Sequence, residues 1–360
     1  MANLSFGILL APYRVDYYNY LHDEFNFEIY FRQKGFQGQL FSTEDVVEKC
    51  SYKPKYMTIK WIGKYSFATG LYRIIKRNRP KVIIVPEFSL IAIQVILIKF
   101  IFGCKYKIVS QCDDSYDMLT GGKNFSFFHK IARRVCLPFL SDLILVDKKA
   151  TEWYQANYNK GQWVPIIQNE NCFFRNCDVI EDSSKIFREQ YNLRSKLSIL
   201  FVARHIALKN FPTLLHACKE FPQPYQIIVV GDGEMRVQWE QLANQMGINA
   251  LFLGQKNGNE LYSIYKACDI FVLPSFIEAF GAVTNEALLN GCICVISKNA
   301  GSACLIDEGI NGFLFNPNSA DELFRALLKA AELAKTNDKK NKMSISFPEI
   351  MNNAFNNILK

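Results

Sequence analysis

The sequence predicts an α/β protein made of two doubly wound domains that face each other across a cleft. Two observations support this fold class. Short apolar, strand-like runs alternate with helical patterns, and the alternation breaks once and then starts again. Short buried strands separated by helices are typical of parallel sheets with right-handed crossovers. A chain of 360 residues, 49% of them hydrophobic, is long enough to bury two cores.

Five strand-like runs are expected in each domain. Those of the first domain are Phe6–Leu10, Phe27–Phe31, Val82–Val85, Tyr106–Ser110 and Leu143–Val146. Those of the second are Ser198–Val202, Gln226–Val230, Ala250–Leu253, Ile270–Leu273 and Cys292–Ile296. Helical patterns lie at Phe211–Glu220, Glu234–Met246, Asn259–Ala267 and Ala320–Ala334. In such folds, ligands bind at the carboxyl ends of the strands.

The domain boundary is expected in a polar stretch from about residue 165 to 196, which contains Pro165. This stretch is typical of a linker that leads into the first helix of a second domain. We therefore expect domains over 1–170 and 171–345. The last residues, from about 346 to 360, have the pattern of an amphipathic helix.

Composition excludes several classes of protein. Eleven cysteines without a Cys-x-x-Cys motif, and only four histidines, indicate neither a zinc ribbon nor a disulfide framework. The N-terminus has no basic segment before its apolar run, so we expect a strand there and not a signal peptide. The longest apolar stretch, Phe88 to Phe102, is shorter than the roughly 20 residues that a membrane span needs. A cytoplasmic protein with reduced thiols is expected.

Basic residues are concentrated in the first half of the chain. Residues 1–170 contain 23 Lys and Arg against 15 Asp and Glu, whereas residues 171–360 contain 19 of each, so the net charge of +8 lies in the first half. No nucleic-acid reading motif accompanies these residues, so we expect no nucleic-acid partner.

An aromatic and basic helix is expected at Phe125 to Val135, and two interpretations of it stay open. Such a helix can lie on an anionic membrane surface, at the inner face of the membrane. It can also be an ordinary surface helix whose apolar side chains face the core while its charges stay in water. Those side chains are Phe127, Phe128, Ile131 and Val135.

The motifs whose residues could bind a ligand or take part in a reaction follow the strands of the second domain. Arg204 and Lys209 flank a strand-to-helix loop, where two cations could hold a diphosphate that leaves with two charges. Gly231 and Gly233 form a tight turn after the next strand, where the backbone can approach a ligand closely, and Gly254 follows the strand after that. With the stretch from Leu273 to Gly291, which follows the next strand, these make four motifs at successive strand ends, and together they indicate one binding site.

The stretch from Leu273 to Gly291 is the most informative part of the chain. It predicts a strand, a loop with Glu278, and a short helix that carries Glu286 and ends at Gly291, a residue suited to a left-handed cap. Free backbone N–H groups at the start of that helix favour a phosphate. Carboxylates beside it suit sugar hydroxyls, which donate hydrogen bonds to them. Together these features favour a nucleotide-sugar as ligand.

Residues 197–325 resemble glycosyltransferase family 4, which comprises retaining enzymes of the GT-B fold with two Rossmann-like domains. The residues that carry the resemblance are Arg204, Lys209-Asn210, Gly231 to Glu234, Phe252 to Gly254, Tyr265 to Asp269, Leu273 to Ser275, Glu278 to Gly281 and Glu286-Ala287. It implies a nucleoside-diphosphate-sugar donor, UDP- or GDP-linked, bound by the second domain. It also implies that the C-terminal helix packs back on the first, acceptor-binding domain.

The resemblance also implies roles for individual residues. Glu278 would contact the hydroxyls of the donor sugar and Glu286 the ribose. Arg204 and Lys209 would stabilise the departing diphosphate. The remaining residues that would line the donor site are Phe280, Gly281, Ala282 and Val283.

The implied chemistry needs no metal and no cofactor. The chain has no Asp-x-Asp motif, so cationic side chains and a helix N-terminus would take the place of a metal on the diphosphate. In the family, the leaving phosphate is thought to help deprotonate the acceptor on the same face of the sugar. A covalent role for Glu278, like that of a retaining glycosidase, is the less favoured alternative.

The first domain departs from the family pattern. Where relatives often have a glycine-rich loop, this chain reads Ala11 to Asn19 without a glycine, and Arg14 is a candidate to compensate or to receive the acceptor. Where many relatives have a histidine, it has Asp113 and Asp114, which are candidates to orient the acceptor or to cap a helix.

The sequence therefore predicts a retaining glycosyltransferase that transfers a hexosyl group to a polysaccharide or lipid-linked glycan precursor. Two alternatives share the fold. One is a nucleotide-sugar epimerase or hydrolase, and the other is an inactive family member that acts as a binding partner. A nicotinamide-dependent oxidoreductase is disfavoured, because no Gly-x-Gly-x-x-Gly motif follows the first strand of either domain.

Overall fold

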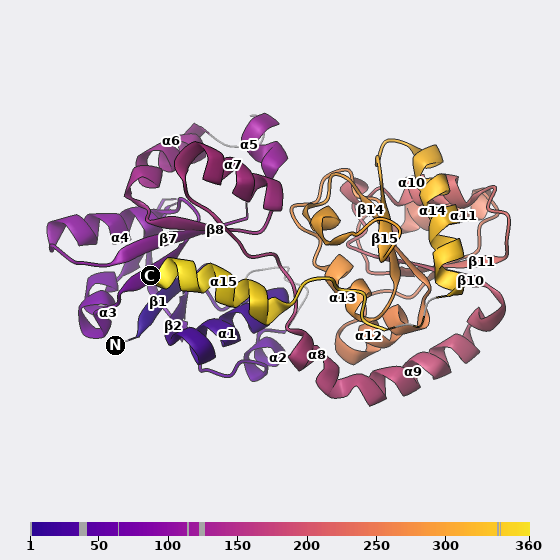
Figure 1. Ribbon diagram of the computed structural model, residues 1–360, viewed down its shortest axis with the longest axis horizontal. Coiled ribbons are helices and arrows are strands. Elements are labelled where there is room, and N and C mark those ends of the chain that lie inside the picture. Colours follow the sequence, from indigo (N-terminus) through magenta and orange to yellow (C-terminus); the bar gives the residue numbers. More distant parts are fainter. Residues whose placement is uncertain are drawn as a thin grey trace. The chain divides into compact units, whose positions relative to one another are not determined.

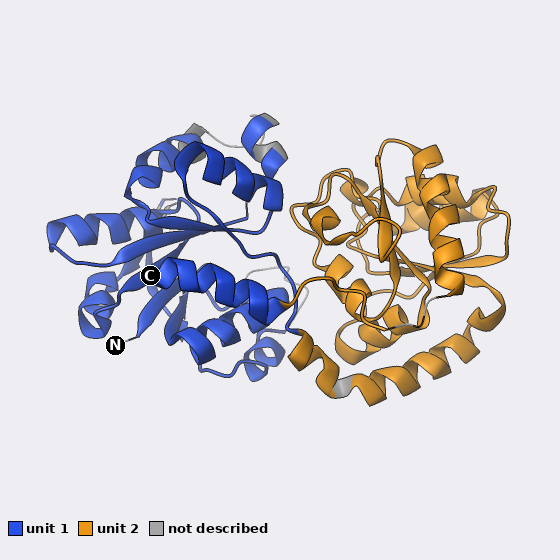
Figure 2. Cartoon of the chain, viewed as in Figure 1, with its two compact units in different colours: residues 1–169, 347–360 blue, residues 170–346 orange. Residues whose placement is uncertain are grey.

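The chain divides into two compact units. The computed structural model describes residues 2–35, 42–63, 65–113, 115–121, 127–336, 338 and 340–360. Unit 1 comprises residues 1–169 and 347–360, and unit 2 comprises residues 170–346, as coloured in Figure 2. Each unit has a parallel sheet with helices around it, so the predicted α/β class with two doubly wound, Rossmann-like halves is confirmed.

Unit 1 contains a seven-stranded parallel sheet of order β3-β2-β1-β6-β7-β8-β9 and a separate antiparallel hairpin, β4-β5. The strands are β1 Asn3–Gly7, β2 Phe27–Phe31, β3 Lys55–Tyr56, β4 Thr58–Ile62, β5 Tyr65–Thr69, β6 Val82–Pro86, β7 Lys107–Cys112, β8 Asp142–Leu145 and β9 Gln162–Trp163. The helices are α1 Val15–Phe25, α2 Thr43–Glu48, α3 Leu71–Asn78, α4 Leu90–Ile101, α5 Tyr116–Gly121, α6 Phe127–Cys136, α7 Lys148–Tyr158 and α15 Phe347–Leu359, with short 3-10 turns η1 Pro12–Arg14 and η2 Leu137–Phe139.

Unit 2 contains a six-stranded parallel sheet of order β12-β11-β10-β13-β14-β15. The strands are β10 Leu197–Val202, β11 Tyr225–Val230, β12 Ala250–Phe252, β13 Ile270–Leu273, β14 Ile293–Ser297 and β15 Gly312–Phe315. The helices are α8 Glu170–Phe173, α9 Cys177–Gln190, α10 Phe211–Cys218, α11 Arg236–Gln245, α12 Gly258–Ala267, α13 Val283–Leu289 and α14 Ala320–Lys335, with 3-10 turns η3 Phe174–Asn176, η4 Leu193–Ser195, η5 Ala207–Lys209 and η6 Gly301–Leu305.

The sheet of unit 2 is buried on both faces because its strands are continuous apolar runs. On one face, alternate residues such as Ile199 and Phe201 of β10 pack with Phe211 of α10 and Leu327 of α14 in a single core. The strand order reverses between β10 and β13, which are neighbours in the sheet but separated by two strands in the sequence. A switch of this kind opens a crevice at the carboxyl ends of the strands.

The C-terminal helix α15 belongs to unit 1. Its ring Phe355 stacks on Phe25 of α1 at 5.0 Å, and Phe347 meets Tyr20 of the same helix edge-on at 5.4 Å between ring centroids. In Figure 1, α15 is the yellow helix beside α1. The chain crosses between the units twice, after Asn169 and before Phe347. At these crossings the Ser346 hydroxyl donates a hydrogen bond of 2.6 Å to Glu170.

Several element boundaries differ from those expected. The run Phe6–Leu10 lies three residues later than β1, because the ladder with β2 begins at Asn3 and ends at Gly7. Much of the polar stretch 165–196 is not an open linker but contains the 14-residue helix α9, which packs on α12 of unit 2. The strands β3, β9 and β15 and the hairpin β4-β5 were not expected. Two-residue strands such as β3 leave no periodicity in a sequence.

Candidate functional site

Three loops at the carboxyl ends of β10, β11 and β12 are joined through their backbones. The N–H of Gly231 donates to the carbonyl of Gly254 at 2.9 Å, which links the loops after β11 and β12. The N–H of His205 donates to the carbonyl of Asp232 at 2.8 Å, and the N–H of Met235 donates to the carbonyl of His205 at 2.9 Å. The predicted motifs at these strand ends therefore form one connected surface beside the sheet switch point.

Gly231 and Gly233 are required by the protein's own packing. Both have a positive φ, and a Cβ added to Gly231 would lie 1.9 Å from the carbonyl oxygen of Ala203. A Cβ on Gly233 would lie 2.5 Å from the carbonyl oxygen of His205. The close approach that these glycines permit is thus to the loop after β10, the loop that carries Arg204.

His205 fixes that loop from inside the core. Its side chain is fully buried, with its ring centroid 5.0 Å from that of Trp239. Within the described part of the chain, neither ring nitrogen has a hydrogen-bond partner. Burial lowers the pKa of His205 below its ordinary value, although nearby Asp232 acts to raise it. The sequence showed His205 only as the residue after Arg204, with no sign that it would be buried and uncharged.

Arg204 and Lys209 both lie on this loop, but their side chains are in different environments. The Arg204 side chain is exposed, and among the described residues it forms no ion pair or side-chain hydrogen bond. The ammonium of Lys209 is paired with the carboxylate of Glu278, and these two side chains are only 15% and 17% exposed. The structure thus joins two residues to which the sequence gave separate roles.

Asn210 holds Lys209 beside Glu278. Its backbone is left-handed, with φ of 54°, a conformation that asparagine tolerates better than most residues. Its buried side-chain amide donates to the carbonyl of Pro274 at 3.0 Å and to that of Pro317 at 2.9 Å. Because Pro274 begins the loop after β13, these bonds bring the loops after β10 and β13 together across the switch point. The sequence gave Asn210 no role of its own.

The loop that carries Glu278 is fixed by the turn η6. The carbonyl of Glu278 accepts from the N–H of Gly301 at 3.1 Å, and the carbonyl of Phe280 accepts from the N–H of Ser302 at 2.7 Å. A Cβ on Gly301 would lie 2.3 Å from the carbonyl oxygen of Ala279, so only glycine fits there. Phe280 is 2% exposed, which leaves its backbone and not its ring to meet a ligand.

Gly281 and Ala282 lead into α13, and Val283 is its first residue. Gly281 has φ of 89°, and a Cβ there would lie 2.8 Å from Leu273. The other end of α13 closes as expected. Gly291 is left-handed, and the N–H groups of Gly291 and Cys292 donate to the carbonyls of Leu288 and Ala287, which is the hydrogen-bond pattern of a Schellman cap.

Glu286 lies on α13 in a partly buried position. Burial raises its pKa from 4.5 to about 7, and the hydroxyl of Tyr265 acts in the opposite direction. Near neutral pH the carboxyl is therefore divided between its ionised and protonated forms, so it can accept hydrogen bonds or donate one. The influence of Tyr265, a core residue of α12, was not visible in the sequence.

In unit 1, Arg14 and Asp113 form an ion pair. The Nη2 atom of Arg14 lies 2.6 Å from Oδ1 of Asp113, and their side chains are 6% and 47% exposed. The guanidinium also lies 5.5 Å from the ring centre of Tyr17. Burial is the largest single influence and acts to lower the pKa of Arg14, but Asp113 together with three neighbouring tyrosines outweighs it, so the net shift is upward. Asp114, the other acidic candidate, lies outside the described residues.

Asp113 does not cap the helix that follows it. The N–H of Tyr116, the first residue of α5, donates to Asp147 at 3.2 Å. The carboxylate of Asp147 also accepts from the N–H of Ala150 at the start of α7. The capping alternative for Asp113 is therefore wrong, because its carboxylate faces Arg14.

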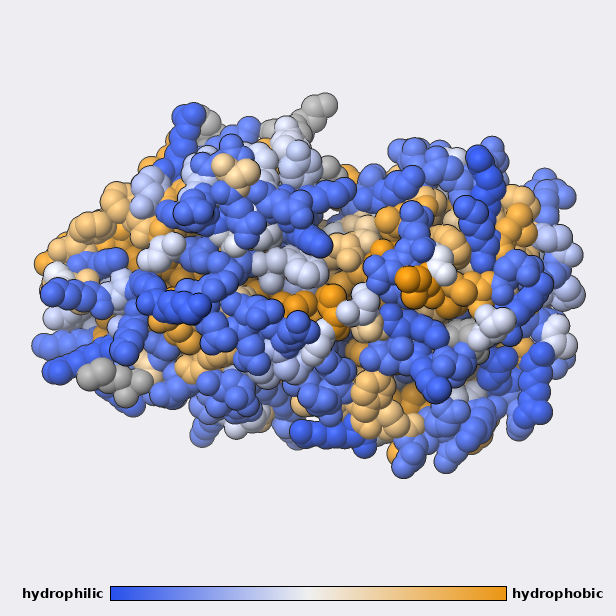
Figure 3. All heavy atoms as spheres, viewed as in Figure 1, coloured by the Kyte–Doolittle hydropathy of each residue, from blue (hydrophilic) through white to orange (hydrophobic). Residues whose placement is uncertain are grey.

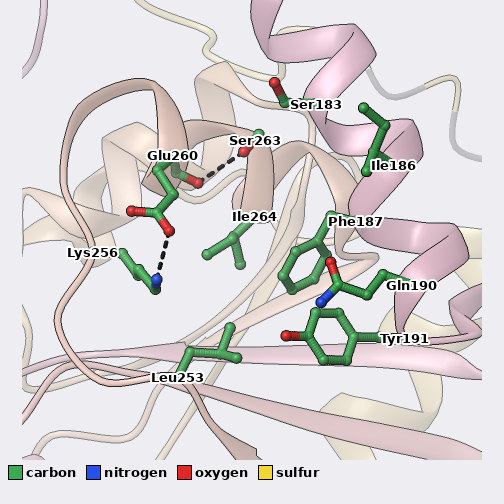
Figure 4. A pocket seen from close by; sticks show the side chains of 10 residues that line it. All are labelled: Ser183, Ile186, Phe187, Gln190, Tyr191, Leu253, Lys256, Glu260, Ser263 and Ile264. Atoms are coloured by element: carbon green, nitrogen blue, oxygen red, sulfur yellow. Dashed lines mark hydrogen bonds and ion pairs between the residues drawn. The ribbon is translucent and has the colours of Figure 1, made fainter.

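A pocket of about 270 Å³ lies elsewhere on unit 2, between α9, α12 and the loop after β12 (Figure 4). Its polar lining includes Lys256, which is paired with Glu260, and its apolar lining includes Phe187 and Leu253. None of the predicted donor-site residues lines it. Elsewhere in the described ranges, no group of three or more His, Cys, Asp or Glu side chains could hold a metal ion.

Comparison with known proteins relates this site to one enzyme family. Residues 183–345 match the family model of glycosyl transferases group 1. An uncharacterized glycosyltransferase of Methanocaldococcus jannaschii is 31% identical over 153 residues, which cover 39% of this chain and 39% of the relative. The UDP-Gal:alpha-D-GlcNAc-diphosphoundecaprenol alpha-1,3-galactosyltransferase of Escherichia coli is 33% identical over 108 residues, 29% of this chain and 27% of that protein. The matches thus span well under two thirds of these relatives' own lengths.

A solved structure matches almost the whole chain. Anabaena HepE in complex with UDP superposes with a TM-score of 0.73 at 17% identity, over 99% of this chain and 96% of that one. At this identity the likeness shows the fold, which is that of GT-B glycosyltransferases. The match to glycosyl transferases group 1 therefore concerns residues of unit 2, while the likeness over the whole chain is one of fold.

Proposed function

We propose that this chain is a retaining glycosyltransferase of family 4 that transfers a hexosyl group from a nucleoside-diphosphate sugar to a glycan acceptor. The observation that carries the proposal is the pairing of Lys209 with Glu278 at the switch point between β10 and β13, on the loop that also carries the exposed Arg204. The segment that contains them lies within the match to glycosyl transferases group 1. The galactosyltransferase relative is named for a UDP-linked donor, and HepE was solved with UDP. We take the donor here to be UDP- or GDP-linked.

Arg204 is the group we assign to the diphosphate. It is exposed and lies outside any ion pair among the described residues, so a phosphate can approach it without displacing a carboxylate. A charge-assisted bond from a guanidinium to phosphate is strong and geometrically specific. The backbone of Gly281, Ala282 and Val283 lies at the N-terminal end of α13, and we assign it to the same donor.

Lys209 and Glu278 act as a unit in this proposal. The ammonium of Lys209 lies against the carboxylate of Glu278, whose oxygens can accept hydrogen bonds from sugar hydroxyls. Lys209 has further N–H donors for the phosphate oxygen that takes up charge as the bond to the sugar breaks. Glu286 we assign to the ribose hydroxyls, with its backbone helix α13 fixed by the cap at Gly291.

The transfer step balances without a protein base. The bond between the anomeric carbon and the phosphate oxygen breaks, and the bond to the acceptor oxygen forms on the same face of the sugar. The proton of the acceptor hydroxyl passes to the leaving phosphate. Arg204 and Lys209 would stabilise the charge of that diphosphate, and the reaction as proposed uses no cofactor or metal.

The acceptor is proposed to be a polysaccharide or lipid-linked glycan precursor at the cytoplasmic face of a membrane. The Escherichia coli relative is named for a diphosphoundecaprenol-linked acceptor, which supports this choice. The acceptor would be bound by unit 1, with Arg14 and Asp113 in the loops that follow β1 and β7. No helix in the described ranges is both long and apolar enough to cross a membrane.

A panel of nucleoside-diphosphate sugars tests the proposal. One donor is expected to raise the melting temperature, because a ligand that binds the folded state stabilises it by mass action. With that donor, release of nucleoside diphosphate should require an acceptor, and Glu278→Gln should abolish the release. Release at full rate without acceptor would instead indicate an epimerase or hydrolase. A failure of every donor to shift the melting temperature would reject the donor site.

A further inference from the structure

The end of α4 and the turn after it expose an unusual group of large apolar side chains in unit 1. Leu97, Phe100, Ile101 and Phe102 are 52%, 61%, 70% and 50% exposed. Single exposed apolar residues are common on soluble proteins, but a contiguous group of this kind marks an interaction surface. The same stretch was notable in the sequence only as the longest apolar run.

Ring contacts make this group continuous with neighbouring elements. Phe102 stacks on Tyr72 of α3 at 3.9 Å, and Phe100 meets Phe139 of η2 edge-on at 5.3 Å between centroids. Helix α6, which directly precedes η2 in the chain, extends the group with Ile131 and Val135, which are 44% and 52% exposed. Figure 3 shows hydrophobic residues gathered over the part of unit 1 where Figure 1 draws α4.

The exposure of α6 decides between two interpretations of its sequence. If it were an ordinary surface helix, Ile131 and Val135 would face the core, but both are exposed. Phe127 and Phe128, the other two residues of that interpretation, have side chains outside the described set. The ordinary surface-helix reading is therefore wrong for Ile131 and Val135, and the interaction surface extends well beyond α6.

Positive charge predominates in the segments that carry the apolar group. The segments 71–81, 88–106 and 127–141 contain ten Lys and Arg residues and no Asp or Glu. The exposed cations among them are Arg73, Lys76, Arg77, Arg79, Lys81, Lys105, Lys130 and Arg134. The Lys76 ammonium lies 5.9 Å from the ring centre of Tyr72, so at least one cation adjoins the aromatic contacts directly.

We propose that this surface, made of the α4 end, α3, α6 and η2, docks on an anionic lipid bilayer. Apolar side chains at its centre would enter the boundary between headgroups and acyl chains, and the flanking cations would bind anionic headgroups. A second copy of the chain fits poorly, because a symmetric interface would bring the same cations together. Nucleic acid would leave the exposed aliphatic side chains without a partner. The inference stands on unit 1 alone and does not depend on the transferase proposal.

Vesicle sedimentation without any donor or acceptor tests the surface. The intact protein is expected to bind vesicles of phosphatidylcholine and phosphatidylglycerol in equal parts, but not vesicles of phosphatidylcholine alone. Binding should weaken as salt is added, because salt screens exposed charges. The double variant Phe100→Ser with Ile101→Ser should lose about tenfold or more in binding, since less apolar area enters the bilayer. Arg73→Glu with Lys76→Glu should lose a similar factor.

Matched variants in unit 2 serve as controls. Val237, on α11, is 61% exposed and Lys219 is also exposed, so Val237→Ser and Lys219→Glu should bind vesicles like the unchanged protein. The proposal fails if the unchanged protein ignores anionic vesicles, or if the Phe100 and Ile101 variant binds them fully. It also fails if that variant converts a dimer into a monomer without vesicles, which would make the surface a contact between copies. Acceptor-independent release of nucleoside diphosphate would reject the transferase proposal while leaving this one intact.

Discussion

The strand-end loops at the switch points of the two units hold a cation in opposite ways. In unit 2 the loop after β10 is fixed by the close approach of Gly231 and Gly233 and by the amide of Asn210. Those contacts involve no charge, and Arg204 stays exposed. In unit 1 the corresponding position after β1 holds Arg14, which is buried and neutralised by Asp113.

The difference shows which of these two loops has a cation available for a ligand. An exposed guanidinium can bind phosphate at little cost, whereas Arg14 would first have to give up Asp113 and part of its buried position. We therefore expect Arg204 to affect ligand binding and Arg14 to affect mainly stability. Substitutions that separate these two effects test the comparison.

Gly231→Ala should have the largest effect on stability. The new Cβ would lie 1.9 Å from a backbone oxygen at a φ of 124°, so the loop after β10 must move. We expect a loss of about 3 kcal/mol or more in the free energy of unfolding, measured by urea denaturation. Gly258→Ala is the control, because its φ is also positive but no atom lies within 4 Å. Equal losses at the two glycines would show that packing against Ala203 is unimportant.

Asp113→Ala should have the next largest effect on stability, because it leaves the buried Arg14 without its counter-charge. We expect a loss of about 2–3 kcal/mol, somewhat below the cost for a fully buried pair, since Asp113 is half exposed. Asp182→Ala removes the exposed pair with Lys185 and should cost less than about 0.5 kcal/mol. If both variants unfold at the same urea concentration, the Arg14 pair has no structural role.

Glu286 should make the free energy of unfolding depend on pH, with a smaller effect than the two substitutions above. Its pKa in the folded protein is about 7, above the ordinary 4.5, so the folded state holds the proton more tightly. The free energy of unfolding should therefore fall as pH rises from about 4.5 to about 7. The interval between the two pKa values corresponds to at most about 3 kcal/mol, and solvent screening of this partly exposed carboxyl lowers the expected fall to about 1–2 kcal/mol. Glu286→Gln should remove this decrease, and a decrease of the same size in that variant would assign it to another group.

His205 changes the free energy of unfolding in the opposite direction over part of the same pH range. Its folded pKa lies below the ordinary 6.5, so its contribution is present above pH 6.5 and is lost as pH falls. The difference between the unchanged protein and Glu286→Gln at each pH removes this contribution, because both proteins contain His205.

Much of unit 2 could be predicted from the sequence because its strands are continuous apolar runs that end in glycine, proline or charge. The run Ser198–Val202 falls within β10, and Ile270–Leu273 coincides with β13. In parallel sheets, strand ends alone indicate which loops meet. The pairing of Lys209 with Glu278 could not be predicted, since the two residues are 69 positions apart and either could have faced a ligand alone.

Features that depend on burial also could not be predicted from the sequence. His205 reads like a polar residue in a binding loop, yet its ring is enclosed by Phe201, Trp239 and Phe252. Arg14 and Asp113 were each singled out as candidates to contact an acceptor, but their pairing depends on how β1 and β7 are placed in the sheet. Local pattern gives the element, while the environment of a side chain comes from tertiary packing.

The most direct test of the account is the affinity for UDP and GDP of Arg204→Ala, measured by titration calorimetry beside Arg14→Ala and the exposed control Arg194→Ala. We expect Arg204→Ala to weaken binding of the preferred nucleotide by about 10- to 100-fold, the loss of a charge-assisted bond, with unfolding free energy unchanged to within about 0.5 kcal/mol. Arg14→Ala and Arg194→Ala should leave the affinity unchanged. Unaltered affinity in Arg204→Ala, or an equal loss in Arg14→Ala, would contradict the claim that unit 2 alone offers a cation to the diphosphate.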